Sequence, residues 1–248
     1  MKFIGSVIMF LFLHSTLHAQ VDTINTANHK LNTSLLKEGK STYVVYFEDS
    51  LGKRITSADI WDRTIRFSSN AEGKNIYQFE WDWYRKDTLI GHIVATGDRQ
   101  TLEPFTHKAE YHRRPLVSFA FANNLVTVPV EARRTAADSS FKVLLDPPAF
   151  EFPMDLEIFP LLPFKKVGQK FAIAFYEPGT PKSDYYPLTV TGREELSLPG
   201  NNKVSCWLLR IDYRPGSYAT FWISEKSREV LKMQEYFRGR YRYKVRLY

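Results

Sequence analysis

Three side chains in the first half of the chain have the types and spacing that general acid–base chemistry requires. Glu80 and Asp82 lie two residues apart in a segment that alternates polar and aromatic residues, so both carboxylates point from one face of a β-strand. His92 follows after a turn and would face them across a hairpin. Such a group can transfer protons to a substrate if a cleft encloses it. On a solvated sheet face these are ordinary polar residues, and we favour that interpretation.

The last segment of the chain carries a second chemical pattern, a row of cations. Even-numbered residues from 238 to 246 are all basic, whereas odd-numbered residues from 241 to 247 are aromatic or aliphatic. In a strand this places five cations on one face, roughly 7 Å apart. The row could bind phosphate groups of a lipid or another anionic envelope component. Alternatively the charges protect a terminal edge strand from aggregation, which we favour. The five residues are Arg238, Arg240, Arg242, Lys244 and Arg246.

Sequence motifs of the common catalytic and metal sites do not occur in the chain. There is no Gly-rich phosphate loop, no Gly-x-Ser-x-Gly turn, no His-Glu-x-x-His and no Cys-x-x-Cys. Cys206 is the only cysteine, and its strand-like surroundings predict a small buried side chain. His107 and His112 lie in a polar stretch and are predicted to be surface residues. We therefore expect a protein that is not an enzyme, with no catalytic residues, no metal and no cofactor.

The N-terminus has the pattern of a secretory signal. Lys2 supplies a positive charge, residues 3–13 are mostly apolar, and Ala19 is a small residue at the expected cleavage position. The apolar run is shorter than the roughly 20 residues of a membrane span. We predict a signal peptide over residues 1–19, cleavage near Ala19–Gln20, a periplasmic or secreted protein, and no transmembrane segment in the mature chain. Without Lys2, 33 basic and 27 acidic residues remain, a balance that does not indicate nucleic acid.

The rest of the chain is predicted to form strands. Residues 20–40 are polar and are predicted to be a flexible N-terminal tether. From residue 41 onward, β-branched and aromatic segments alternate with turn signals. No repeat of fixed period and no alternation of strands with long helices occurs, which favours one antiparallel β domain over residues 41–248. The sequence does not indicate which oligomeric state the protein adopts.

Residues 146–164 are different, because five prolines interrupt an apolar segment. They exclude a long helix or a central strand and leave room for one or two helical turns over Asp155–Phe159. The apolar content favours a segment that crosses one face of the sheet over a solvated linker. The predicted fold class is mainly β, a curved antiparallel sheet or open half-barrel with a short helical or prolyl segment across one face.

Three further segments are informative together: residues 36–46 (LKEGKSTYVVY), 155–168 (DLEIFPLLPFKKVG) and 219–233 (ATFWISEKSREVLKM). They resemble a family of bacterial envelope proteins that is defined only as a domain of unknown function, DUF3108. The third segment is also similar to a hairpin of the lipoprotein carriers LolA and LolB. The resemblance implies an open, curved antiparallel sheet that holds acyl chains, and it implies no catalytic residues.

Our leading hypothesis is a non-enzymatic envelope protein that binds an apolar or amphipathic, lipid-like ligand. Trp81, Trp83, Phe159 and Phe221 would line the cavity and the prolyl segment would be its lid, since acyl-chain sites use such linings. Alternatively these aromatic residues fill a solid core. A second hypothesis is an interaction or assembly factor that binds an anionic partner through the basic last strand. A third is a hydrolase that uses the carboxylates and histidine described first.

Overall fold

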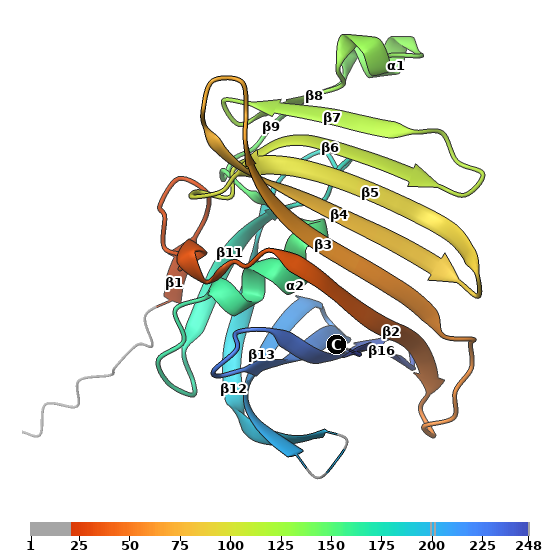
Figure 1. Ribbon diagram of the computed structural model, residues 1–248, viewed down its shortest axis with the longest axis vertical. Coiled ribbons are helices and arrows are strands. Elements are labelled where there is room, and N and C mark those ends of the chain that lie inside the picture. The colour runs from red at the N-terminus through yellow and green to blue at the C-terminus, as the bar shows by residue number, and fades with distance from the viewer. Residues whose placement is uncertain (1–20, 199, 201, 248) are drawn as a thin grey trace, which may run out of the picture.

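The computed structural model describes residues 21–198, 200 and 202–247, so the predicted signal peptide lies outside the described residues. Its sixteen strands form a single open sheet. The sheet curves around a short helix, α2 (Asp155–Ile158), as Figure 1 shows. The predicted fold class, a mainly β protein with a curved open sheet and a short helical segment across one face, is confirmed. No described helix is long and apolar enough to cross a membrane.

Two series of antiparallel strands join side by side to make this sheet. The order runs from β1 through β11–β16 and then through β2–β9, with β16 paired to β2 at the junction. The strands before the crossing segment are β2 (Gly39–Asp49), β3 (Asp59–Ser69), β4 (Asn75–Arg85), β5 (Thr88–Asp98), β6 (Pro104–Tyr111), β7 (Val117–Ala122), β8 (Leu125–Thr127) and β9 (Lys142–Leu144). The strands after it are β11 (Lys170–Tyr176), β12 (Asp184–Leu198), β13 (Asn202–Arg214), β14 (Ser217–Ser224), β15 (Val230–Phe237) and β16 (Arg240–Arg246).

Alternating burial explains why these segments form strands. In β3 the side chains of Asp59, Trp61, Arg63 and Ile65 are buried, and the residues between them are partly exposed. A period of two buries one face of a strand and leaves the other in contact with water. We call the face that carries these buried side chains the inner face of the sheet and the opposite one the outer face.

The tether prediction was wrong for residues 21–40, because this segment packs against the sheet. β1 (Val21–Ile24) pairs in parallel with β11, and a single turn, η1 (Thr33–Leu35), follows it. Ile24, Leu31 and Leu36 are buried in the main core. Three apolar side chains spaced among many polar ones are enough to fix the segment, although its average composition is that of a linker. The sheet is therefore not entirely antiparallel.

Residues 146–164 cross the inner face, as their prolines and apolar side chains predict. They include β10 (Phe150–Glu151), η3 (Phe152–Met154), α2 and η4 (Phe159–Leu161). Leu156, Ile158 and Phe159 are buried in one core together with side chains from both series of strands. Each such side chain contributes roughly 2 kcal/mol when it leaves water. Two further short helices, η2 (Val130–Ala132) and α1 (Ala136–Ser140), connect β8 to β9.

Four charged side chains also join α2 to the inner face, and we call them the latch: Arg63, Asp155, Glu157 and Lys244. Arg63 Nε donates to Glu157 Oε1 at 2.9 Å, and Arg63 Nη2 lies 3.6 Å from Asp155 Oδ1. Lys244 Nζ lies 3.3 Å from Asp155 Oδ2. None of the four side chains is more than 12% exposed. Because buried charges are tolerated only when they are paired, the four groups depend on one another.

Lys244 is expected to make stability rise with pH. Burial lowers its pKa to about 8 from the ordinary 10.5, although Asp155 favours the charged form. Between these values the unfolded chain binds the proton and the folded protein has released it, so the free energy of unfolding increases with pH. Urea unfolding should show this group adding about 1 kcal/mol between about pH 7 and pH 9. The Lys244→Met variant should lack that increment, and equal pH dependence in both proteins would contradict the assignment.

Candidate functional site

A cavity of about 800 Å³ lies on the inner face, between the crossing segment and the ends of β12–β16. Its position follows from the register of the sheet. Ser217 is opposite Phe237, and Phe237 is opposite Arg240, so one row of cavity residues crosses three strands. Glu235 is opposite Arg242, which begins a second row. The full lining is Phe47, Phe152, Glu177, Thr180, Tyr186, Tyr213, Arg214, Ser217, Glu235, Phe237, Arg238, Arg240 and Arg242.

One wall of the cavity is aromatic. The ring of Phe152, from η3, lies 5.2 Å from that of Tyr186 and 6.2 Å from that of Tyr213. Burial raises the pKa of Tyr213 well above its ordinary value and raises that of Tyr186 as well. Both phenols are therefore neutral at physiological pH. The wall offers an apolar surface with two hydroxyl groups, which suits the apolar part of a ligand.

The opposite side of the cavity is cationic. The guanidinium carbons of Arg214 and Arg238 lie 5.1 and 4.9 Å from the ring centroid of Phe237. Arg240 faces the same ring across the β15–β16 pair. Arg242 forms an ion pair with Glu235. Within the described residues, Arg214, Arg238 and Arg240 form no ion pair, so this side carries uncompensated positive charge.

Glu177 is the second carboxylate of the cavity. Burial raises its pKa, Asp155 and Glu151 raise it further, and His107 lowers it. The residue as a whole is exposed, but the protein around its carboxylate weakens the hydration of the charged form.

The predicted cationic row is divided by the structure. Arg238, Arg240 and Arg242 line the cavity, Lys244 belongs to the latch, and Arg246 pairs with Glu229 at 2.8 Å. Because β16 pairs with both β15 and β2, it is not an edge strand, and the interpretation as edge protection was wrong. The cations face the inner side.

The aromatic side chains predicted to line a ligand site lie elsewhere. Phe159 and Phe221 are fully buried and pack against each other with ring centroids 4.8 Å apart. Trp81 and Trp83 pack around Trp61, at 4.5 and 5.8 Å from its ring. None of the four predicted residues lines the cavity described above. Phe159 and Phe221 belong to the main core, and Trp81 and Trp83 are partly buried side chains that pack against it, which agrees with the alternative interpretation of a solid core.

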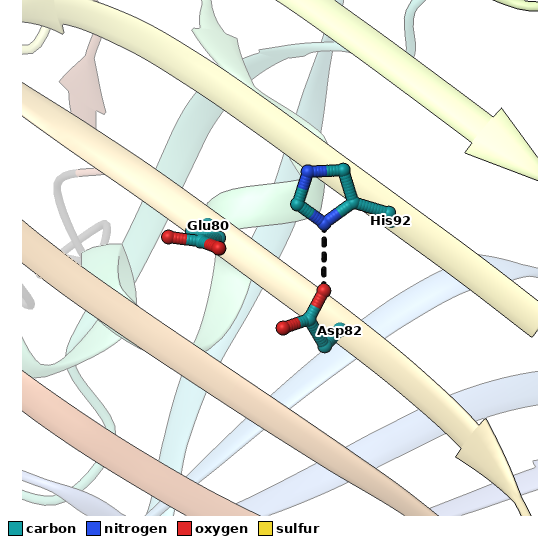
Figure 2. A group of neighbouring side chains, drawn as sticks. All are labelled: Glu80, Asp82 and His92. Carbon is teal, nitrogen blue, oxygen red and sulfur yellow. Dashed lines mark hydrogen bonds and ion pairs between the residues drawn. The ribbon is translucent and has the colours of Figure 1, made fainter. Parts of the chain in front are cut away.

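The carboxylates and histidine of the acid–base hypothesis do come together, on the outer face. Figure 2 shows Glu80 and Asp82 on β4 and His92 on β5, and His92 Nδ1 lies 2.6 Å from Asp82 Oδ1. Their ligand atoms all lie within 4.8 Å of one another, which a divalent cation could bridge. However, Glu80 is already paired with Arg66 at 2.6 Å, and none of the three lines the cavity. We assign them no catalytic or metal-binding role.

No protein-family model matches the chain, and no curated protein matches it. One similar solved structure is the crystal structure of a beta-barrel-like protein of the domain of unknown function DUF1849 from Brucella abortus. It has 8% sequence identity and a TM-score of 0.46, over 84% of this chain and 95% of that one. The resemblance to DUF3108 and to lipoprotein carriers stays a prediction.

Proposed function

We propose that this protein is exported to the cell envelope and binds an amphipathic, lipid-like ligand in the inner-face cavity. The observation that carries the proposal is the cavity itself, about 800 Å³ with an aromatic wall on one side and a cationic wall on the other. This volume is within the range of small-molecule sites, and a lining that is aromatic on one side and cationic on the other suits a ligand with an apolar part and an anionic part. Export is proposed from the signal-like residues 1–19.

The position of the cations favours a small ligand over a macromolecular partner. Arg238, Arg240 and Arg242 face into the cavity, and Lys244 is buried. A large anionic partner that bound the predicted row would need all five cations on an accessible face. Only part of the row is accessible, and that part lies beside aromatic side chains. The two earlier hypotheses, an apolar cavity and an anion-binding strand, thus converge on one site.

Filling the cavity is expected to weaken ligand binding. Ser217, a small buried residue of β14, lines the cavity, so the Ser217→Phe side chain would occupy the space of the ligand. We expect dansyl-labelled undecanoic acid to bind the unaltered protein saturably, with Kd in the micromolar range, and this variant to bind it about tenfold more weakly. The measurement is a fluorescence titration.

The matched control is Thr220→Phe. Thr220 lies on the same strand, three residues further on, and points to the outer face, between the buried Ala219 and Phe221. The same phenylalanine side chain at this position does not enter the cavity, so binding should be retained. The proposal fails if the unaltered protein shows no saturable binding, or if both variants bind as it does.

A further inference from the structure

We infer that the ligand carries a phosphate group, and that Arg214, Arg238 and Arg240 form the subsite that binds it. This inference rests on the proposed function and specifies the polar part of the ligand. The shared chemistry is that of a phosphate group with more than one negative charge, whether it is a monoester headgroup of a lipid or free phosphate. Three features of the cavity support it.

The first feature is that the sheet brings the three guanidinium groups to one place. Arg214 is opposite Ser217 across β13–β14, Ser217 is opposite Phe237, and Phe237 is opposite Arg240. Arg238 directly follows Phe237 in the turn that leads to β16. Residues from three strands and one turn are thus neighbours around a single aromatic ring.

The second feature is that this ring orients two of the guanidinium groups. The carbons at the centres of the Arg214 and Arg238 guanidinium groups lie 5.1 and 4.9 Å from the centroid of Phe237. Contact with an aromatic face fixes the plane of a guanidinium group and leaves the N–H groups at its edge free to donate. Two guanidinium groups held this way can donate to different oxygen atoms of one anion.

The third feature is the positive charge of the arginines that form no ion pair. Arg242 is paired with Glu235, whereas the other three arginines have no ion pair within the described residues. Arg242 also keeps its Nε buried without a hydrogen-bond partner in that part of the chain. Three like charges close together repel one another, and an anion with more than one negative charge offsets this repulsion. A phosphate monoester, which carries a charge of about −1.5 to −2 at neutral pH, fits better than a carboxylate.

The backbone at Arg238 agrees with a role in binding. Arg238 and Gly239 occupy the two central positions of the β15–β16 turn, with φ values of 51° and 77°. Turns of this kind favour Asn or Asp followed by Gly, because other L-residues are strained at positive φ. An arginine at the first position is unfavourable for the turn, and a side chain chosen against local preference is characteristic of functional sites.

The experiment compares two amphiphiles of equal chain length, dodecyl phosphate and dodecyl maltoside, by calorimetry in a buffer without phosphate. We expect dodecyl phosphate to bind the unaltered protein about tenfold more tightly. The variant Arg238→Asn with Arg240→Gln should lose this preference and still bind dodecyl maltoside. Because Asn suits the turn, Arg238→Asn alone should leave the melting temperature unchanged or higher while it weakens binding of dodecyl phosphate.

The control is Arg210→Gln, which removes a cation from the outer face of β13, where Arg210 stacks on Tyr218 at 3.8 Å. This variant should keep the full preference for dodecyl phosphate. Equal affinities for the two amphiphiles, or a preference that survives loss of Arg238 and Arg240, would overturn the phosphate subsite but not the proposed function. If neither amphiphile binds, the proposed function fails with it. Displacement of dodecyl phosphate by inorganic phosphate at similar concentration would support the subsite and identify free phosphate as the source.

Discussion

The Arg63→Met variant is expected to lose about 3–5 kcal/mol of stability, the usual cost of removing one partner from a buried ion pair. Arg63 is 2% exposed. Burial opposes its charge, but Glu157 and Asp155 more than offset this effect and raise its pKa above the ordinary value. Its Nη2 also donates to the carbonyl oxygen of Pro153 at 2.6 Å. Without the guanidinium group, the carboxylates of Asp155 and Glu157 on α2 would remain with only Lys244 to compensate them.

Urea unfolding followed by tryptophan fluorescence measures this loss, and β3 supplies a matched control. Arg66 lies on the outer face of β3 and pairs with Glu80, but its side chain is 59% exposed. Exposed ion pairs contribute less than about 1 kcal/mol, so Arg66→Met should be nearly neutral. Adding Glu157→Gln to Arg63→Met should recover part of the stability, because one of the uncompensated charges is then gone. Equal losses for Arg63→Met and Arg66→Met would show that the latch contributes no more than a surface pair.

The latch matters for the cavity because both use the same short segment. Pro153, which accepts the hydrogen bond from Arg63, follows Phe152, the residue of η3 that forms part of the aromatic wall. Lys244 of the latch lies two residues after Arg242 on the same face of β16. The latch therefore fixes the position of Phe152 in the aromatic wall. It also turns the even-numbered side chains of β16, which include Arg242, toward the cavity. We expect the Arg63→Met variant to bind amphiphiles more weakly even under conditions in which it is folded.

The alternation of apolar and polar residues predicted most of the fold, because this pattern depends only on residues that are close in the sequence. It identified β4 correctly, with Tyr77 and Phe79 buried and the carboxylates of Glu80 and Asp82 on the outer face. The prolines of residues 146–164 left room for only one or two helical turns, and α2 in that segment has four residues. Cys206 is buried as predicted. These features are local, and local preferences decide them.

Which side chains of β16 lie on the inner face of the sheet could not be predicted in this way. Alternation shows that a strand has two faces but not which one is inner, although apolar side chains are usually the buried ones. Tyr241 and Tyr243 instead lie on the outer face, where Tyr241 packs against Tyr236 at 5.2 Å. The reversal results from Asp155 of the crossing segment and Glu235 of β15, which offer carboxylates to the cations of β16 on the inner side. Such partners, one of them distant in sequence, are not visible in the strand itself.

The same limit explains the misplaced ligand site and one misplaced histidine. The aromatic cavity residues Phe152, Tyr186 and Tyr213 come from separate segments, and only the register of β11–β13 and the crossing segment brings them together. His107 was predicted to be at the surface, but it is 3% exposed and its Nδ1 lies 3.1 Å from Glu151 Oε1. The polar composition around His107 gave no sign that β10 would supply a buried carboxylate.

Replacing Gly97 with alanine should cost about 3 kcal/mol or more, because the added methyl group has no space. A Cβ atom at Gly97 would lie 2.4 Å from the carbonyl oxygen of Glu103 and 2.5 Å from the hydroxyl oxygen of Tyr77. Gly97 sits in β5 beside an irregularity in its pairing with β6, and Tyr77 is fully buried. Neither the backbone carbonyl nor a tyrosine ring held in the core can move away at low cost.

Two further variants separate this clash from a general cost of alanine in a strand. At Gly192 a Cβ atom would be 3.5 Å from Leu208, an ordinary contact, so Gly192→Ala should be neutral or slightly stabilising. Adding Tyr77→Phe to Gly97→Ala removes the contact with the tyrosine hydroxyl. The added Cβ atom would still meet the carbonyl oxygen of Glu103, and it would still lie 2.6 Å from a carbon of the aromatic ring, so the second substitution should restore little stability. Thermal and urea unfolding measure both effects. Full recovery in the double variant would assign the clash to the hydroxyl group alone, and a neutral Gly97→Ala would contradict the close approach of β5 to Tyr77 and Glu103.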